Sequence, residues 1–126
     1  MSLGFSASGG GSSGGSATVT SVVTVSQLTA NTNNLAIAFN APIVVAKLSS
    51  DALRNLTGVV AGNDGQILIL VGTGSNDINI IDSSANSDAA NRFLGDFGDT
   101  TIGPVSSPTT LVYDTTESRW RVIAPV

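Results

Sequence analysis

The chain contains neither cysteine nor histidine among its 126 residues. Without cysteine it can form no disulfide framework and can offer no thiolate nucleophile. Without histidine it has no Ser-His-Asp triad, no histidine metal site and no imidazole for acid-base catalysis. These absences remove the residue sets on which most hydrolases depend, so we expect no enzymatic activity, no metal and no cofactor.

Carboxylates are the remaining candidates for catalysis, because a pair of them can hydrolyse a glycoside. Aspartate is also a preferred turn residue, since its side chain accepts hydrogen bonds from nearby backbone amides. The segments 76–88 and 96–99 lack the alternating ligands and final glutamate of a calcium loop. We therefore interpret nearly all of the candidate carboxylates as turn residues; the candidates are Asp64, Asp77, Asp82, Asp88, Asp96, Asp99, Asp114 and Glu117.

Charge is scarce, since only 11% of the residues are charged, against about 25% in typical soluble domains. Five basic and nine acidic side chains give a formal net charge of −4. This balance leaves no basic surface for nucleic acid or anionic lipid. Uncharged polar groups are desolvated at lower cost than charges, so the composition favours a protein that packs against copies of itself or against a larger assembly.

Long hydrophobic runs are absent as well. No apolar run approaches the roughly 18 residues of a membrane-spanning helix, and the first residues lack the basic and apolar regions of a secretory signal. The chain length fits one domain with one core. We expect a single soluble domain with no membrane partner.

A change in composition divides the chain into an arm and a body. Residues 1–16 contain six glycines and six serines, which is the composition of a flexible linker. Leu3 and Phe5 are the apolar side chains expected to anchor this arm if it docks on a neighbouring protein. Residues 17–126 are expected to form the β-domain, and its first charged residue is Lys47.

Short apolar segments separated by turn residues predict an all-β body. Alternating or β-branched residues are typical of strands, and clusters of Gly, Asn and Asp mark the turns. Repeated short strands of this kind predict one small β-sandwich, jelly-roll-like domain or barrel. No repeat of fixed period indicates a solenoid. We expect strands at 17–25, 35–39, 43–48, 56–61 and 67–71, and a short helix or 3₁₀ turn within 87–94.

Residues 67–71 are five consecutive large aliphatic residues in one expected strand. Both faces of such a strand require burial, which a single solvated sheet cannot supply. A second packing surface is therefore needed, either inside the subunit or between subunits. The candidates for this core or subunit interface are Ile67, Leu68, Ile69 and Leu70.

The last two apolar segments predict a hairpin with a defined register. If residues 115–118 form a four-residue loop, Tyr113 lies opposite Trp120 and Asp114 opposite Arg119. Tyr113 and Trp120 then share the apolar face with Leu111 and Val122, and we add them to the core or interface candidates. The polar face carries Asp114, Arg119 and Arg121. Arg119 and Arg121 are candidate glycan contacts, although pairing within the sheet or between subunits is the favoured alternative.

Residues 43–123 carry an ordered set of short motifs. These are Gly65-Gln66, Gly74-Ser75, Asn91-Arg92, Tyr113-Asp114 and Arg119-Trp120. In this order they resemble a recurring β-module of tailed-bacteriophage virion proteins, especially of fibre and receptor-binding tips. The resemblance implies a virion structural protein that is commonly homotrimeric and not an enzyme. A fibre tip usually follows a long shaft, whereas here only a short Gly/Ser arm precedes the body.

The resemblance and the arm together favour a capsid decoration, or cement, protein. Its body would form an oligomer, with a trimer expected, on the outer surface of the capsid. Many weakly docked arms would bind the major capsid protein tightly by acting together. The alternative is a head-fibre or tail-fibre module that recognises host surface glycan, with Trp120, Tyr113 and residues 115–118 as contacts.

Overall fold

The computed structural model describes residues 19–95 and 98–123, whose regular structure is β-strand apart from one short 3₁₀ helix. The predicted all-β class is therefore confirmed. The arm, with Leu3 and Phe5, lies outside the described residues. The elements are β1 (Thr20–Thr24), β2 (Ile43–Leu48), β3 (Arg54–Leu56), β4 (Ile67–Gly72), β5 (Ile78–Ile80), η1 (Ala89–Asn91), β6 (Phe93–Leu94), β7 (Thr100–Ile102), β8 (Thr109–Asp114) and β9 (Arg119–Ile123).

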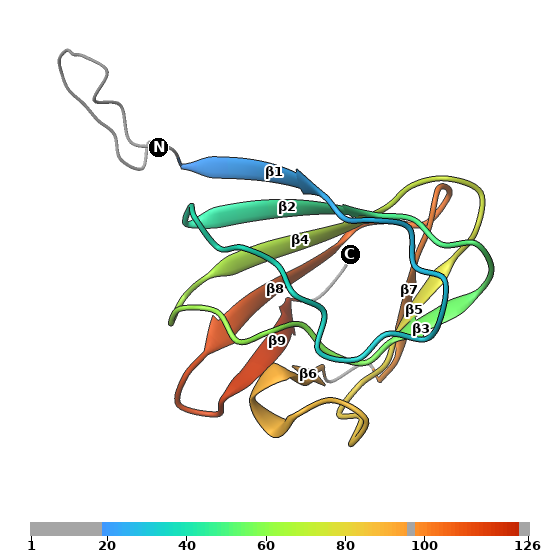
Figure 1. The fold of residues 1–126 in the computed structure, drawn as a ribbon. Helices are drawn as coiled ribbons and strands as arrows, with labels where there is room; N and C mark the ends of the chain where they lie inside the picture. The colour runs from blue at the N-terminus through green and yellow to red at the C-terminus, as the bar shows by residue number, and fades with distance from the viewer. Residues whose placement is uncertain (1–18, 96–97, 124–126) are drawn as a thin grey trace, which may run out of the picture.

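The strands form two sheets that enclose one core (Figure 1). The larger sheet has six strands in the order β1-β2-β4-β8-β9-β6, and the smaller has three in the order β3-β5-β7. The strands β1, β2 and β4 run parallel to one another, as do β3 and β5. The hairpin β8-β9 is antiparallel, and β8 joins the parallel part of the sheet through β4.

The parallel pairings show that the chain winds in successive coils. Thr20 pairs with Ile43 and Ile43 with Ile67, which gives steps of 23 and 24 residues in the sequence. Arg54 and Ile78 pair across the smaller sheet at the same 24-residue step. We call residues 20–42 coil 1, residues 43–66 coil 2, and the coil that begins at Ile67 coil 3. The architecture is thus a β-solenoid-like stack and not clearly a sandwich or barrel, and the expectation that no repeat of fixed period exists is wrong.

A ladder of asparagines follows the same period. The backbone N–H of Asn55 donates to Asn31 Oδ1 (3.0 Å), and Asn79 Nδ2 donates to Asn55 Oδ1 (3.1 Å). Each step spans 24 residues in the sequence. Thr101 Oγ1 on β7 extends the ladder by donating to Asn79 Oδ1 (3.0 Å). Each of these asparagine side-chain oxygens therefore accepts a hydrogen bond from the next coil or from β7, so that each coil is held in register with the next.

Inward-facing side chains from both sheets fill the core. Successive side chains of a strand point to opposite faces, so β2 and β4 each contribute alternate residues. Full burial of a valine, leucine, isoleucine or phenylalanine side chain stabilises the fold by about 1.5–3 kcal/mol. The hydrophobic side chains with no exposed surface are Val44, Ala46, Leu48, Leu56, Val59, Leu68, Leu70, Ile78, Phe93, Ile102, Leu111 and Trp120.

The C-terminal hairpin closes one end of the enclosed core in the predicted register. Tyr113 pairs with Trp120 and Asp114 with Arg119, with residues 115–118 between the strands. The Trp120 ring lies 5.0 Å from that of Tyr113 and 5.3 Å from that of Phe39, measured between ring centroids. Its Nε1 donates to the carbonyl oxygens of Val59 (3.1 Å) and Val60 (3.2 Å). The hairpin is therefore joined to coils 1 and 2 by one buried aromatic cluster.

Two of the expected strands are wrong. At 56–61 the strand β3 ends at Leu56, and the residues that follow it pair only through isolated bridges at Gly58 and Val59. Residues 35–39 form no strand, because coil 1 meets coil 2 there at only one isolated bridge, between Leu35 and Val59. The helical element expected within 87–94 is confirmed as the 3₁₀ helix η1. Its Asn91 carbonyl accepts a hydrogen bond from the Val59 N–H (3.0 Å), which attaches it to coil 2.

Candidate functional site

The outer face of the six-stranded sheet carries apolar side chains from five strands, and Lys47 on β2 and Arg121 on β9 share this face with them. Val22, Val45 and Ile69 form one row across β1, β2 and β4, and the row continues through Thr110 to Ile123. Val22 is 58% exposed and Ile123 is 44% exposed. We call this surface the outer sheet face and define it as Val22, Ile43, Val45, Ile67, Ile69, Val71, Val112 and Ile123.

The aliphatic segment 67–71 contributes to the core and to the outer sheet face. Leu68 and Leu70 are fully buried, so the second packing surface that this strand requires lies partly within the chain. Ile67 and Ile69 point outward and remain partly exposed. Alternation along one strand therefore separates the four predicted candidates into two core residues and two surface residues.

The charged side chains of the hairpin lie next to the outer sheet face, where Arg121 pairs with Val112. Asp114 Oδ2 lies 3.5 Å from Arg121 Nη1, so the ion pair joins Asp114 to Arg121 although Arg119 is its cross-strand neighbour. Arg119 Nη1 instead donates to the carbonyl oxygens of Ser118 (2.9 Å) and Glu117 (3.4 Å). A surface pair of this kind is worth under about 1 kcal/mol. Both arginines thus bind groups of the hairpin itself, which agrees with the interpretation that they pair within the sheet.

Tyr113 and Trp120 are core residues. Trp120 has no exposed surface and Tyr113 is 4% exposed. Tyr113 Oη donates to the carbonyl oxygen of Ala90 (2.7 Å), and burial raises the pKa of its hydroxyl. Neither ring presents a face at which a sugar could stack, whereas the turn residues 115–118 between them in the sequence are exposed.

A pocket of about 500 Å³ lies between two stacked turns of coils 1 and 2. Gln66 is one of the lining residues and is buried, and its Nε2 donates to the carbonyl oxygens of Ala41 (2.8 Å) and Pro42 (3.1 Å). Gly65 has a φ of 81°, a backbone conformation that glycine adopts readily, in the turn that precedes β4. The lining residues are Phe39, Asn40, Ala41, Pro42, Asn63, Asp64, Gly65 and Gln66.

This pocket combines one aromatic ring with short polar side chains. Such a combination is suited to a neutral saccharide, whose apolar faces stack on rings and whose hydroxyl groups pair with amides and carboxylates. Sequence reasoning missed the site because its two halves are 24 residues apart and meet only when coil 1 stacks on coil 2. The signal that could have revealed it is the pair of turn clusters at residues 40–42 and 63–65.

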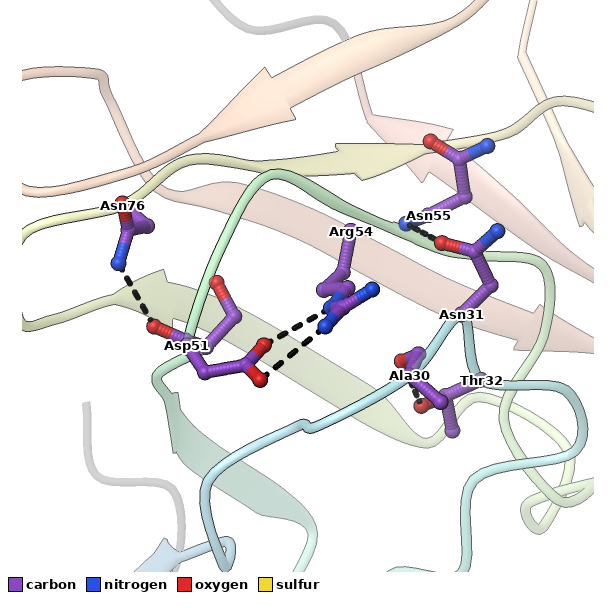
Figure 2. Close-up of polar contacts among 8 residues, drawn as sticks. Ala30, Asn31, Thr32, Asp51, Arg54, Asn55 and Asn76 are labelled. Carbon is purple, nitrogen blue, oxygen red and sulfur yellow. Dashed lines mark hydrogen bonds and ion pairs between the residues drawn. The ribbon is translucent and has the colours of Figure 1, made fainter.

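The polar edge beside β3 is satisfied by its own groups. Figure 2 shows Asp51 accepting two hydrogen bonds from Arg54, from Nε at 2.8 Å and from Nη2 at 3.1 Å. These bonds hold the pKa of Asp51 below its usual value. On the same edge the Asn55 N–H donates to Asn31 Oδ1, and Asn76 Nδ2 donates to the carbonyl oxygen of Ser50 (3.0 Å). We interpret this edge as structural, because its polar groups already bind one another.

Several carboxylates accept hydrogen bonds from turn backbone, as expected of turn residues. Asp64 Oδ1 binds the N–H of Thr115 (3.1 Å), and Asp82 Oδ1 binds that of Gly95 (2.9 Å). Within residues 19–95 and 98–123 no three Asp or Glu side chains gather in a way that could hold a metal ion. Asp96 lies outside the described residues.

No known protein family, curated protein or solved structure matches this chain. In the part of the chain that the structure describes, no helix has the length and hydropathy needed to cross a membrane.

Proposed function

We propose that this chain is a bacteriophage virion structural protein, and specifically a capsid decoration protein that acts by binding alone. The observation that carries the proposal is the outer sheet face, where valine and isoleucine side chains from five strands lie together and are partly or fully exposed. Contiguous exposed apolar side chains mark interaction surfaces in soluble proteins. The resemblance of residues 43–123 to phage virion modules supplies the biological setting.

In this proposal the body and the arm have separate tasks. The outer sheet face joins copies of the body, with a trimer as the expected oligomer. The arm, through Leu3 and Phe5, docks each copy on the major capsid protein at the outer surface of the capsid. Several docked arms on one oligomer bind far more tightly than one arm alone. The scarcity of charge suits both contacts, because little charge has to be desolvated.

Co-sedimentation with capsids tests the docking half of the proposal. The protein is expected to sediment with capsids at near-stoichiometric occupancy and to raise their resistance to heat or pressure. Deletion of residues 1–15 should abolish capsid binding while the body stays folded. Unchanged binding of the deletion variant would contradict the role of the arm.

A pair of valine substitutions tests the role of the outer sheet face. Val45→Lys places a charge at the centre of that face, where its burial between subunits costs several kcal/mol and should break the oligomer. Val105→Lys is the matched control, because Val105 is 92% exposed and lies in the turn after β7. Equal oligomer masses for the two variants in sedimentation equilibrium would refute the assignment.

A head-fibre or tail-fibre module that binds host glycan is the second candidate, and the pocket at residues 39–42 and 63–66 is the observation in its favour. Under this candidate, Phe39→Ala and Asn63→Ala should each weaken binding to bacterial cells or purified surface glycan. Thr116→Ala in the exposed hairpin loop serves as the control for a contact through residues 115–118.

A further inference from the structure

The strand β1 lies at one edge of the six-stranded sheet and belongs to the outermost coil (Figure 1). The side chains of coil 1 are less well covered than their counterparts in the next coils. Val23 is partly exposed, whereas Ala46 and Leu70 in the same row are fully buried. Terminal repeats of stacked proteins need a cap or a partner, because each repeat buries its face against a neighbour. The free end of coil 1 is therefore a surface that association can cover.

The backbone of β1 presents alternate residues at this edge. The Ile43 N–H donates to the Val19 carbonyl oxygen (3.0 Å), and the Val25 N–H donates to that of Lys47 (3.0 Å). Hydrogen bonding in a parallel ladder alternates along the strand, so the odd-numbered residues of β1 face β2. The even-numbered residues Thr20, Val22 and Thr24 consequently direct their N–H and C=O groups away from the sheet.

The sequence of this edge is nearly symmetric about Val22. Residues 19–25 read Val-Thr-Ser-Val-Val-Thr-Val, so that threonines stand two positions, and valines three positions, on either side of Val22. Charged side chains and prolines commonly prevent edge strands from pairing with other chains, and β1 contains neither. An antiparallel copy placed with Val22 opposite Val22 brings Thr20 opposite Thr24 of the second copy. Cross-strand threonine pairs hydrogen-bond favourably.

We infer that β1 pairs antiparallel with β1 of a second copy, about a two-fold axis at Val22. Each of Thr20, Val22 and Thr24 then donates its N–H and accepts at its C=O across the axis, so the outward-directed groups of both edges are matched. The two six-stranded sheets join into one sheet, and their outer sheet faces become continuous. The contact is isologous and closes on itself. It does not depend on capsid binding. It doubles the mass of a monomer, and it doubles the mass of a trimer when all three β1 edges pair with those of one second trimer.

Two double variants with the same positions changed test this pairing. Thr20→Lys/Thr24→Lys places like charges opposite each other across the axis, whereas Thr20→Lys/Thr24→Glu places opposite charges there. Like charges in directly opposed positions destabilise a strand pair and unlike charges stabilise it. We expect the first variant to have half the wild-type mass in sedimentation equilibrium, with a dissociation constant raised about tenfold or more. The second variant should keep the wild-type mass.

Hydrogen exchange measured residue by residue gives an independent readout. In the wild-type protein the amides of Thr20, Val22 and Thr24 should be protected, and in Thr20→Lys/Thr24→Lys they should exchange freely. The amides of Val23 and Val25 face β2 and should stay protected in both, which shows that the body remains folded. A wild-type mass of one or three chains, equal masses for the two double variants, or free exchange at Val22 in the wild type would each overturn the inference. Capsid binding is not among these readouts, so failure of the pairing is distinguishable from failure of the proposed function.

Discussion

Replacement of Trp120 by phenylalanine probes the contact that holds the C-terminal hairpin on the coils. The substitution keeps an aromatic ring but removes the indole N–H and part of the ring volume. In the wild-type protein that N–H donates to the carbonyl oxygens of Val59 and Val60. The same ring packs against Phe39 from coil 1 and Tyr113 from β8. One side chain thus links the hairpin to both coils.

The expected loss in the free energy of unfolding follows from these contacts. Leaving a buried carbonyl without its hydrogen bond costs about 1–2 kcal/mol. The smaller ring leaves a cavity in a site with no exposed surface, which adds about 1 kcal/mol. Trp120→Phe should therefore lose about 2–3 kcal/mol, a large part of the 5–15 kcal/mol by which a typical domain is stable.

Urea unfolding followed by far-ultraviolet circular dichroism measures this loss. Fluorescence is unsuitable, because Trp120 is the only tryptophan in the chain. Val105→Ala is the control, since this exposed side chain should contribute no more than about 0.5 kcal/mol. A loss below about 0.5 kcal/mol for Trp120→Phe would refute the reasoning, because the hairpin would then not depend on its packing against coils 1 and 2.

Three further predictions concern buried groups. Ser50→Ala should leave the free energy of unfolding unchanged or raise it by up to about 1 kcal/mol, because the buried Ser50 hydroxyl has no hydrogen-bond partner among the described residues. Ser87→Ala is its counterpart and should lose about 1–2 kcal/mol, since its hydroxyl is hydrogen-bonded and buried; equal urea midpoints for the two variants would contradict this difference. Gly58→Ala should lower the free energy of unfolding by about 2 kcal/mol, because an added Cβ would lie 2.5 Å from the Asn91 carbonyl oxygen. An unchanged melting temperature would contradict this close packing. Burial raises the pKa of the Tyr113 hydroxyl above 10, its ordinary value in the unfolded chain. The stability that the protonated hydroxyl contributes is therefore complete below pH 10 and is lost as the pH rises through the pKa of the folded state. Tyr113→Phe should abolish this loss of stability at alkaline pH, and persistence of the loss in pH-dependent unfolding would exclude Tyr113 as its cause.

Local patterns predicted individual strands and the hairpin correctly. The register of β8 and β9 follows from sorting side chains by face, since a one-residue shift would mix Tyr113 and Trp120 with charged residues. The strand at 43–48 has the predicted bounds because a turn containing Pro42 precedes it. These features depend on neighbours that are close in the sequence, so the sequence alone specifies them.

The stacking of the coils was not predicted, because it depends on pairs 23 or 24 residues apart. Few coils are present, and their sequences differ at most positions, so the spacing of 23 or 24 residues does not show as sequence similarity between coils. The recurrence of asparagine at Asn31, Asn55 and Asn79 was the available signal, and it becomes meaningful once the side-chain oxygens of Asn31 and Asn55 are seen to accept hydrogen bonds from the next asparagine in the series. The pocket at residues 39–42 and 63–66 escaped prediction for the same reason, since stacking creates it.

The central claim is that this β-body is mounted on the outside of a phage capsid. A map of the intact virion at side-chain resolution tests it most directly. We expect bodies with the coil and hairpin arrangement of β1–β9 on the outer capsid surface, each connected by its arm to the major capsid protein. Density for the same body at the tip of a head or tail fibre, with none on the capsid, would contradict the claim.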